Sequence, residues 1–501
     1  MAGIKSLAKD TAVYGFSSIL GRLLNWLLVP MYTRVFVSEE YGIVVFDYSA
    51  VALMLALLTY GMETGFFRFV NHERWNKPME VYSTSLISLA ISSSAFVIIA
   101  ACLVGPLSEL MRTPDRPSCT LLLAATVALD AFTAIPYGYL RYRSKALRFA
   151  TVRLINIGLN IGFNLFFLLA CPWLAAHAPG AVDWFYDPGY GIGYIFLSNF
   201  IASAATLILL APELRGFPWV FNARLWKEML RYSWPLLILG VVGLMNQNLP
   251  NIMFPYLATQ LSPAEADAAL GTYGACYKIG MIMVMFLQAF RFAYEPFIFA
   301  RDKRANPAGT KAYSDAMKYF IIVSLFIFMA VMFYLDIIKL FIGSRYYGAL
   351  GIVPVIMAAE LFFGVVFNLS VWYKLTDRTI WGSILSLIGF AVMLTVNVIF
   401  VPRISYYACA WGAFASYGVM MLVSYFVGQA KYPVDYCVRR LAAYTALAAV
   451  LYVAGIYGLD ALALNAWAAG AVRAVLLTVF IAVAVRAENI PLGAAIAKIR
   501  R

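Results

Sequence analysis

Apolar runs long enough to cross a lipid bilayer recur along this chain from Thr11 almost to its last residue. Each run has about 20 residues, which as a helix matches a hydrocarbon core of ~30 Å, and short polar segments separate the runs. Inside a bilayer the backbone N–H and C=O groups must be satisfied by the protein itself, as they are within a helix. The sequence therefore predicts an all-α, polytopic membrane protein.

Windowed hydropathy predicts about 14 transmembrane helices. They are expected near residues 12–36, 42–66, 81–107, 118–140, 150–172, 189–211, 232–256, 271–296, 316–340, 350–372, 380–401, 406–428, 440–458 and 464–486. Only 13% of the 501 residues are charged, against about 25% in a typical soluble domain. Lys5 and Lys9 precede a first apolar run without a small-residue cleavage site, so we interpret this run as a retained helix.

Lys and Arg residues are distributed unevenly between the two sides of the predicted membrane. Most of the 38 fall in the two termini and in the loops on the same side as the termini. The opposite loops hold only Arg34, Arg112, Arg116, Lys339, Arg345 and Arg403. The positive-inside rule therefore places both termini in the cytoplasm. Contact with anionic lipid headgroups accounts for the net charge of +13, so no nucleic-acid partner is expected.

The two halves of the chain resemble each other. The segment that starts at Arg141 aligns without gaps on the segment that starts at Lys374, a shift of 233 residues, and a shift of 232 places Tyr41 on Tyr273. Each half holds six predicted spans, an even number, so the halves should form a parallel repeat with substrate bound between them near the bilayer midplane. We therefore expect six-helix lobes over 1–215 and 216–430 and two additional helices over 431–501.

Five stretches carry a family resemblance: YGFSSILGR at 14–22, PMYTRVF at 30–36, YGMETGFFRF at 60–69, QAFRFAYEPF at 288–297 and WYKLTDRT at 372–379. Through them the chain resembles the multidrug/oligosaccharidyl-lipid/polysaccharide exporter superfamily, and within it the polysaccharide branch of Wzx-type flippases. The resemblance implies alternating access between two six-helix bundles. It also implies an undecaprenyl-diphosphate-linked oligosaccharide, such as an O-antigen or capsule repeat unit, as cargo across a bacterial inner membrane, with a polysaccharide polymerase as a further candidate partner.

Ionisable residues at bilayer depth are costly and normally face a cavity or a partner. Four cations are candidates for binding the lipid diphosphate: Arg22, Lys278, Arg291 and Arg68. The guanidinium group suits a phosphate because it donates in a planar fork. Alternatively, Arg22 pairs with Asp47 or Glu63, Arg291 pairs with Glu295, and Arg68 lies at the membrane interface.

Buried carboxylates raise the question of an energy source. Desolvation disfavours the charged form of a carboxyl group, which suits a site for H⁺ or Na⁺. The candidates for such ion coupling are Asp47, Glu63, Asp130, Glu295 and Glu360. The alternative is that each neutralises a neighbouring cation.

Amide side chains gather within two predicted spans. Asn25, Asn246, Gln247, Asn248 and Asn251 are candidates for a cavity wall that hydrogen-bonds sugar hydroxyls. Interhelical packing is the alternative. Gly158 and Gly162, spaced as GxxxG, are interpreted as a close helix-packing contact.

Several function classes lack their sequence signatures. There is no GxxxxGK[ST] phosphate loop, and the six cysteines form no CxxC pair, so neither ATP hydrolysis nor a metal or other cofactor is expected. A membrane glycosyltransferase or polymerase would need a larger extramembrane loop, so the chain is not expected to be an enzyme. A multidrug antiporter of the same superfamily and a flippase for the peptidoglycan lipid precursor remain as alternatives, although the membrane cations favour an anionic cargo.

Overall fold

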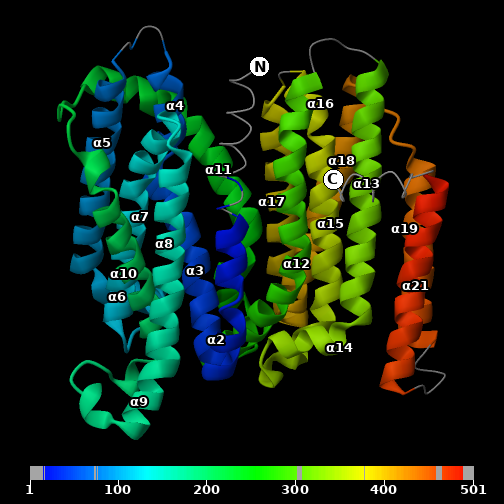
Figure 1. The fold of residues 1–501 in the computed structure, drawn as a ribbon, viewed down its shortest axis with the longest axis horizontal. Coiled ribbons are helices and arrows are strands. Elements are labelled where there is room, and N and C mark those ends of the chain that lie inside the picture. The colour runs from blue at the N-terminus through cyan, green and yellow to red at the C-terminus, as the bar shows by residue number, and fades with distance from the viewer. Residues whose placement is uncertain are drawn as a thin grey trace. The chain divides into compact units, whose positions relative to one another are not determined.

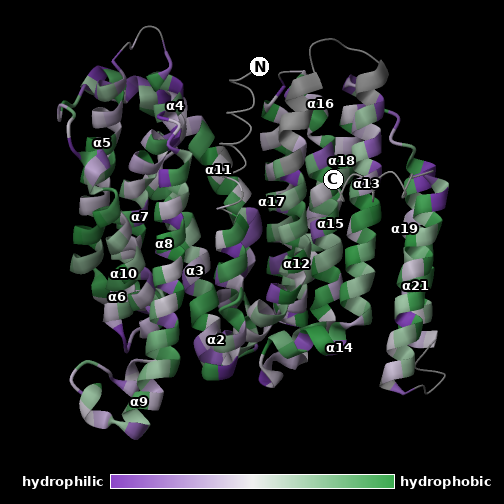
Figure 2. Cartoon of the chain, in the orientation of Figure 1, coloured by the Kyte–Doolittle hydropathy of each residue, from purple (hydrophilic) through white to green (hydrophobic). Residues whose placement is uncertain are grey.

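The computed structural model describes residues 15, 17, 19–72, 75, 77–301, 307–376, 378–458 and 465–488. Side chains are described for these residues except 239, 293, 295–301, 307–310 and 466. Only helices, turns and connecting segments occur in this part of the chain (Figure 1). Apolar residues follow the middle stretches of the long helices, and hydrophilic residues gather toward their ends (Figure 2).

Within the described residues, 12 helices are long and apolar enough to cross a membrane. A thirteenth, α10 (Gly193–Leu209), is apolar but shorter, and the first predicted span lies partly outside the described residues. Each of the 13 overlaps one predicted span. The prediction of a polytopic all-α membrane protein is therefore confirmed.

The chain divides into two compact units. Unit 1 comprises residues 1–275 and 390–412, and unit 2 comprises 276–389 and 413–501. Three helices run through both units: α12 (Pro263–Arg301), α17 (Ile380–Ile404) and α18 (Tyr407–Lys431). This grouping differs from the predicted lobes, because α11 (Ala223–Leu257) packs against α3 (Ser38–Thr59), α4 (Met62–Val70) and α5 (Pro78–Cys102) and so belongs to unit 1.

The described part of unit 1 contains ten further α-helices. They are α2 (Val29–Val35), α3 (Ser38–Thr59), α4 (Met62–Val70), α5 (Pro78–Cys102), α6 (Val104–Leu110), α7 (Pro117–Tyr142), α8 (Ala146–Leu165), α9 (Cys171–His177), α10 and α11 (Ala223–Leu257). Helix α7 packs against α3, α5 and α10, and the fully buried rings of Phe66 and Tyr82 contribute to the core.

A sharp turn separates α3 from α4. Tyr60 and Gly61 both have left-handed backbone conformations, with φ of 33° and 69°. Glycine is favoured at such positions because it has no Cβ. A Cβ on Gly61 would also lie 3.2 Å from the carbonyl oxygen of Ser233, so the turn brings α4 close against α11.

The start of α12 lies against α3 with backbone touching backbone. A Cβ on Gly42 would collide with the carbonyl oxygen of Asp267, and one on Gly271 would collide with that of Ser38. The Asp267 carboxylate in turn accepts two hydrogen bonds from Arg112, at 2.5 and 2.8 Å. The first turns of α12 are thereby fixed within unit 1.

Unit 2 is organised around α13 (Pro307–Phe333). Helices α15 (Val353–Leu369), α19 (Val438–Val453) and α21 (Ala466–Ala487) pack against α13, and the short α14 (Leu335–Ile338) and α16 (Val371–Leu375) complete the unit. Arg473 of α21 donates to the backbone oxygens of Gly455, at 3.0 Å, and Phe333, at 3.1 Å. This membrane-depth arginine therefore satisfies helix-end carbonyls.

The C-terminal end of α21 is held by an ion pair. Lys318 lies 2.6 Å from the Glu488 carboxylate, which also accepts a hydrogen bond from the Tyr444 hydroxyl. Although burial opposes its ionisation, these donors hold the pKa of Glu488 below its ordinary value. The two additional C-terminal helices are thus tied to α13 at this end as well.

The prediction that Gly158 and Gly162 mark a close helix contact is wrong for the described part of the chain. Both glycines are exposed, and nothing in it comes within 4 Å of a Cβ built at either position. Helix α8 instead contacts its neighbours through another face, where Asn156 donates to the Thr206 hydroxyl at 2.9 Å. Side-chain amides, which can hydrogen-bond between helices, thus replace small-residue packing here.

Candidate functional site

Unit 2 brings two cations onto one aromatic ring. The guanidinium of Arg291 in α12 and the ammonium of Lys374 in α16 each lie 4.6 Å from the ring centroid of Phe367 in α15. Arg291 is half-buried and has no ion-pair partner among the described residues. A desolvated cation on a ring face is attracted by the ring quadrupole, yet its N–H groups remain able to bind an anion.

Lys374 was not among the predicted site residues, although the repeat alignment pairs it with Arg141. That pairing was the signal that could have identified it. The side chain of Glu295, the predicted partner of Arg291, lies outside the described residues.

Lys278 occupies the first turn of α12 that belongs to unit 2 and is half-buried. The neighbouring Tyr277 donates a long hydrogen bond of 3.4 Å to the buried carboxylate of Glu360 on α15. Lys278 and Arg291 lie about 20 Å apart along α12, given the rise of a helix. The structure therefore separates Lys278 from the cation cluster at Phe367.

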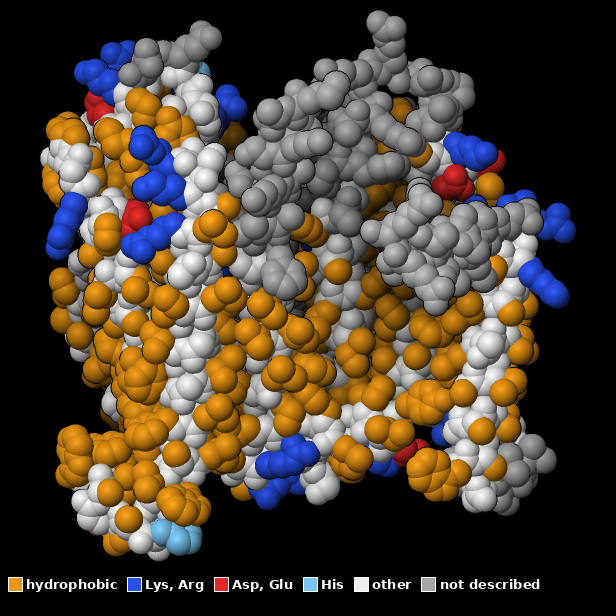
Figure 3. Space-filling model, in the orientation of Figure 1, with side chains coloured by type: hydrophobic (Ala, Val, Ile, Leu, Met, Phe, Trp, Pro, Cys, Tyr) orange, Lys and Arg blue, Asp and Glu red, His pale blue; other side chains and the backbone are white. Residues whose placement is uncertain are grey.

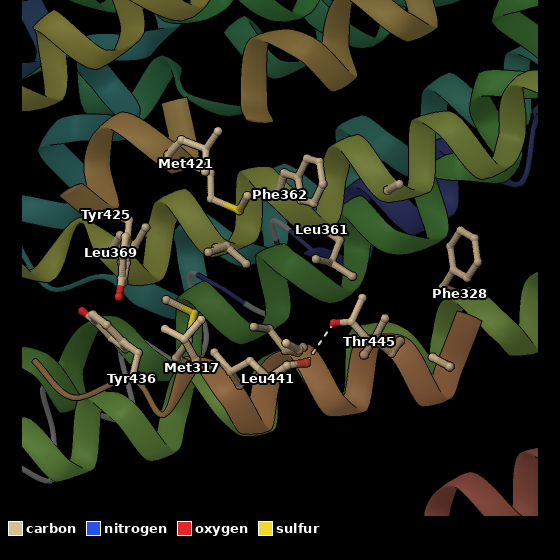
Figure 4. Close-up of a pocket in the computed structure, with 18 of the residues that line it drawn as sticks. Met317, Phe328, Leu361, Phe362, Leu369, Met421, Tyr425, Tyr436, Leu441 and Thr445 are labelled. Carbon is tan, nitrogen blue, oxygen red and sulfur yellow. Dashed lines mark hydrogen bonds between the residues drawn. The ribbon is translucent and has the colours of Figure 1, made fainter. Parts of the chain in front are cut away.

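An apolar groove of about 680 Å³ runs along unit 2 between α13, α15, α18 and α19 (Figure 4). Leu361, Val365 and Leu369 line it from one face of α15, and Leu441 and Ala449 line it from α19. Among the described residues no charged side chain lines the groove, and its polar groups are hydroxyls such as that of Thr445, which donates to the Leu441 backbone oxygen.

Helix α15 contributes both to the groove and to the cation cluster, because it carries the Phe367 ring that the two cations contact. Phe367, which carries the two cations, lies between the groove residues Val365 and Leu369 in sequence but is not itself in the groove lining. Residues two apart point to different sides of a helix. One helix of unit 2 thus presents a cationic aromatic site on one side and an apolar wall on another.

In unit 1 the Arg141 guanidinium is ion-paired with the carboxylate of Glu63 and lies 4.8 Å from the ring centroid of Phe67. Glu63, one of the two partners proposed for Arg22, is thus ion-paired with Arg141. Asp47, the other proposed partner, has no hydrogen-bond partner among the described residues. Arg22 itself lies on the exposed side of its helix.

A ladder of amides joins the first span to α8. Asn164 accepts a hydrogen bond from the Tyr32 hydroxyl at 2.9 Å and donates to Asn160 at 3.0 Å. Asn160 in turn donates to the exposed Asn25 at 3.4 Å. The predicted site residue Asn25 thus belongs to a polar interhelical network, and the two α8 asparagines in it were missed.

Asp47 on α3 is the most isolated carboxyl group in the described part of unit 1. Its side chain is 0% exposed, and neither carboxyl oxygen has a hydrogen-bond partner there. The charge of the Arg112-bound Asp267 acts on it from α12. Burying a charged carboxylate without partners is very costly, so this position favours a neutral acid or a bound cation.

The remaining unit 1 candidates have local partners or open positions. Asp130 accepts from the Ser203 hydroxyl at 2.7 Å, and the Arg68 guanidinium lies 4.4 Å from the ring centroid of Tyr232.

Along α11, Asn246 is buried and Gln247 is exposed. Asn251 donates to Ser49 of α3 at 2.9 Å, and Asn248 donates to the backbone oxygen of Leu244 at 3.0 Å. The polar run on α11 thus has members in packing contacts and members on an open face.

The fold is similar to that of solved transporters. A lipid II flippase, MurJ, in an inward closed conformation has a TM-score of 0.72 at 13% identity, over 96% of this chain and 99% of that chain. An inward-facing multidrug resistance MATE family transporter of the MOP superfamily has 0.65 at 15%, over 84% and 95%. The MATE multidrug transporter DinF-BH has 0.62 at 14%, over 86% and 96%.

Sequence comparison gives the family. No curated protein matches the sequence. A family model described as "Polysaccharide biosynthesis protein" matches residues 7–300, which is more than half of the chain. The chain therefore belongs to the polysaccharide biosynthesis protein family and has the fold of the exporter superfamily that its sequence motifs resemble.

Proposed function

We propose that this protein is a flippase that carries an undecaprenyl-diphosphate-linked oligosaccharide from the cytoplasmic to the periplasmic leaflet of a bacterial inner membrane by alternating access. The observation that supports this function most directly lies in unit 2. There α15 presents the ring of Phe367, with Arg291 and Lys374 on it, and an apolar groove on another side.

Such an arrangement suits an amphiphile with an anionic head and a hydrocarbon tail. Arg291 and Lys374 would bind the diphosphate, for which a guanidinium donates in a fork and an ammonium acts as a point charge. The groove would hold part of the polyprenyl chain, because binding such a chain requires only apolar contacts. A cationic drug would meet repulsion at the same ring.

Asp47 is the carboxyl group that best supports coupling to H⁺. It is fully buried and lacks a hydrogen-bond partner among the described residues, so it is stable there as a neutral acid. The charge of Asp267 from α12 acts on it through space. Loss of its proton would place two carboxylates near each other where α12 touches α3, and so would favour separation of these helices.

Deletion of the gene in its own bacterium tests the function. The expected result is loss of a surface polysaccharide with accumulation of its undecaprenyl-diphosphate-linked repeat unit in the cytoplasmic leaflet. Plasmid-borne wild type should restore the polysaccharide. Changed drug sensitivity with normal glycans would instead support a multidrug antiporter, and arrested peptidoglycan synthesis would support transport of its lipid precursor.

A further inference from the structure

A second groove lies in unit 1, where the turn after α3 meets α5 and the start of α11. It encloses about 840 Å³ and is lined by aromatic, apolar and hydroxyl side chains together with one cation, Arg231. All of its lining residues belong to unit 1, so it is separate from the cations and the groove of unit 2.

The walls of this groove are held in place by a shared hydroxyl. The Ser88 Oγ atom lies 2.6 Å from the Tyr60 hydroxyl and accepts a hydrogen bond from the Trp226 indole at 2.7 Å. Tyr60 occupies the left-handed turn between α3 and α4, so its ring position is tied to that turn. The groove is therefore a fixed feature of unit 1 and not a gap between loosely held side chains.

A stripe of positive charge leads into the groove. Arg224, Lys227 and Arg231 are exposed and follow one another at spacings of three and four residues, which places them on one face of α11. Arg224 is 4.0 Å from Glu228, whereas Lys227 and Arg231 form no ion pair with the residues that the structure describes.

Beyond Arg231 the surface becomes apolar. Trp234 follows three residues later along α11 and is 63% exposed, and Ile91 of α5 is 64% exposed on the opposite wall. Apolar side chains likewise cover the middle stretches of the helices on the face shown in Figure 3, with most Lys and Arg side chains toward their ends. Indole rings favour the headgroup level of a bilayer, where one end of the ring is apolar and the other wet.

We propose that this groove binds an anionic phospholipid from the surrounding leaflet, with its phosphate on Lys227 and Arg231 and an acyl chain along Trp234 and Ile91. The ligand chemistry, a lipid phosphate, is shared with the lipid-linked cargo. The groove favours the phospholipid because the Ser88 hydroxyl is already hydrogen-bonded to Tyr60 and Trp226. Few polar groups are therefore left to bind an oligosaccharide. This site is independent of the cargo site proposed in unit 2.

Tryptophan quenching in nanodiscs tests the site. The full-length protein is reconstituted in zwitterionic lipid, and phosphatidylglycerol or phosphatidylcholine with brominated acyl chains is added in steps. Brominated phosphatidylglycerol should quench at a lower mole fraction than brominated phosphatidylcholine. Trp234→Phe should remove a large part of this difference, because Trp234 lines the acyl-chain wall.

Charge variants complete the test. Each of Lys227→Ala and Arg231→Ala should raise the phosphatidylglycerol mole fraction for half-maximal quenching about fivefold. Lys145→Ala, which removes an exposed cation from the loop before α8, should leave it unchanged. Equal quenching by the two lipids, or unchanged quenching in the double variant Lys227→Ala/Arg231→Ala, would overturn the proposal. Displacement by undecaprenyl diphosphate at a much lower mole fraction would overturn the assignment to phospholipid.

Discussion

The two units use equivalent sequence positions differently. The repeat alignment places Arg141 of unit 1 on Lys374 of unit 2, and in both units the cation lies on an aromatic ring, Phe67 in one and Phe367 in the other. In unit 1 the charge is balanced by Glu63. In unit 2 a second cation, Arg291, shares the ring.

This difference separates a structural cation from a candidate binding cation. An ion pair on an aromatic ring ties two helices together and leaves little positive charge for a ligand. Two cations on one ring repel each other, and an anionic group bound near them would relieve that repulsion. We therefore expect variants at Arg141 to affect stability, and variants at Arg291 to affect transport.

The largest expected effect is on transport by Arg291→Ala. Loss of a charge-assisted contact with the diphosphate should lower the flipping rate by about 30-fold in proteoliposomes, while the unfolding temperature stays close to that of wild type. Arg403→Ala is the matched control, because it removes a cation from the ring of Phe400 on α17 without touching the unit 2 cluster. Equal losses in the two variants would remove the distinction between the units.

A smaller loss of transport is expected when the unit 2 groove is filled. Ala449→Trp places an indole in the groove from an exposed position on α19 and should lower the flipping rate by about tenfold, the effect of some 1.4 kcal/mol of lost tail binding. Ala446→Trp is the control, because Ala446 is exposed on the same helix outside the groove lining. If both variants transport normally, the groove does not hold the cargo tail.

In unit 1, Asp47→Asn should alter the pH response of transport more than its rate. The amide cannot release a proton, so flipping driven by a proton gradient should fall to the rate seen without a gradient. The measurement is the flipping rate in proteoliposomes with and without an imposed pH difference. Asp130→Asn is the comparison, because the Asp130 carboxylate already has a hydrogen-bond donor in Ser203. An unchanged gradient response in Asp47→Asn would exclude this residue as the coupling site.

The smallest effect is expected for Glu63→Gln. The pair with Arg141 is partly exposed, with side chains 39% and 35% accessible, so its loss should cost only about 1 kcal/mol. Thermal unfolding in detergent should therefore shift by about one degree, and Glu63→Gln/Arg141→Gln should recover part of the shift. A collapse of transport without loss of stability would show that unit 1 also binds cargo through Arg141.

Hydropathy and charge alone predicted the class of the protein and nearly every span, because crossing a bilayer imposes a length and a composition on each helix. The interaction partners of individual side chains were harder to predict from the sequence. Arg141 entered the sequence analysis only as the repeat counterpart of Lys374, yet its partner is Glu63, 78 positions earlier in the chain. Likewise, the sequence shows Gly158 and Asn160 on one helix but not which face meets a neighbour, since that depends on tertiary packing.

Arg473 has a wider consequence for how cargo would travel. By donating to backbone oxygens of two other helical segments, at Phe333 and Gly455, it fastens α21 to α13 and to the π-helical segment Ala454–Gly458 that follows α19. Since α19 forms one wall of the unit 2 groove and α13 and α15 form the other, both walls belong to one compact unit. A hydrocarbon chain bound there would move together with its head group in each transport cycle, instead of following it through the bilayer.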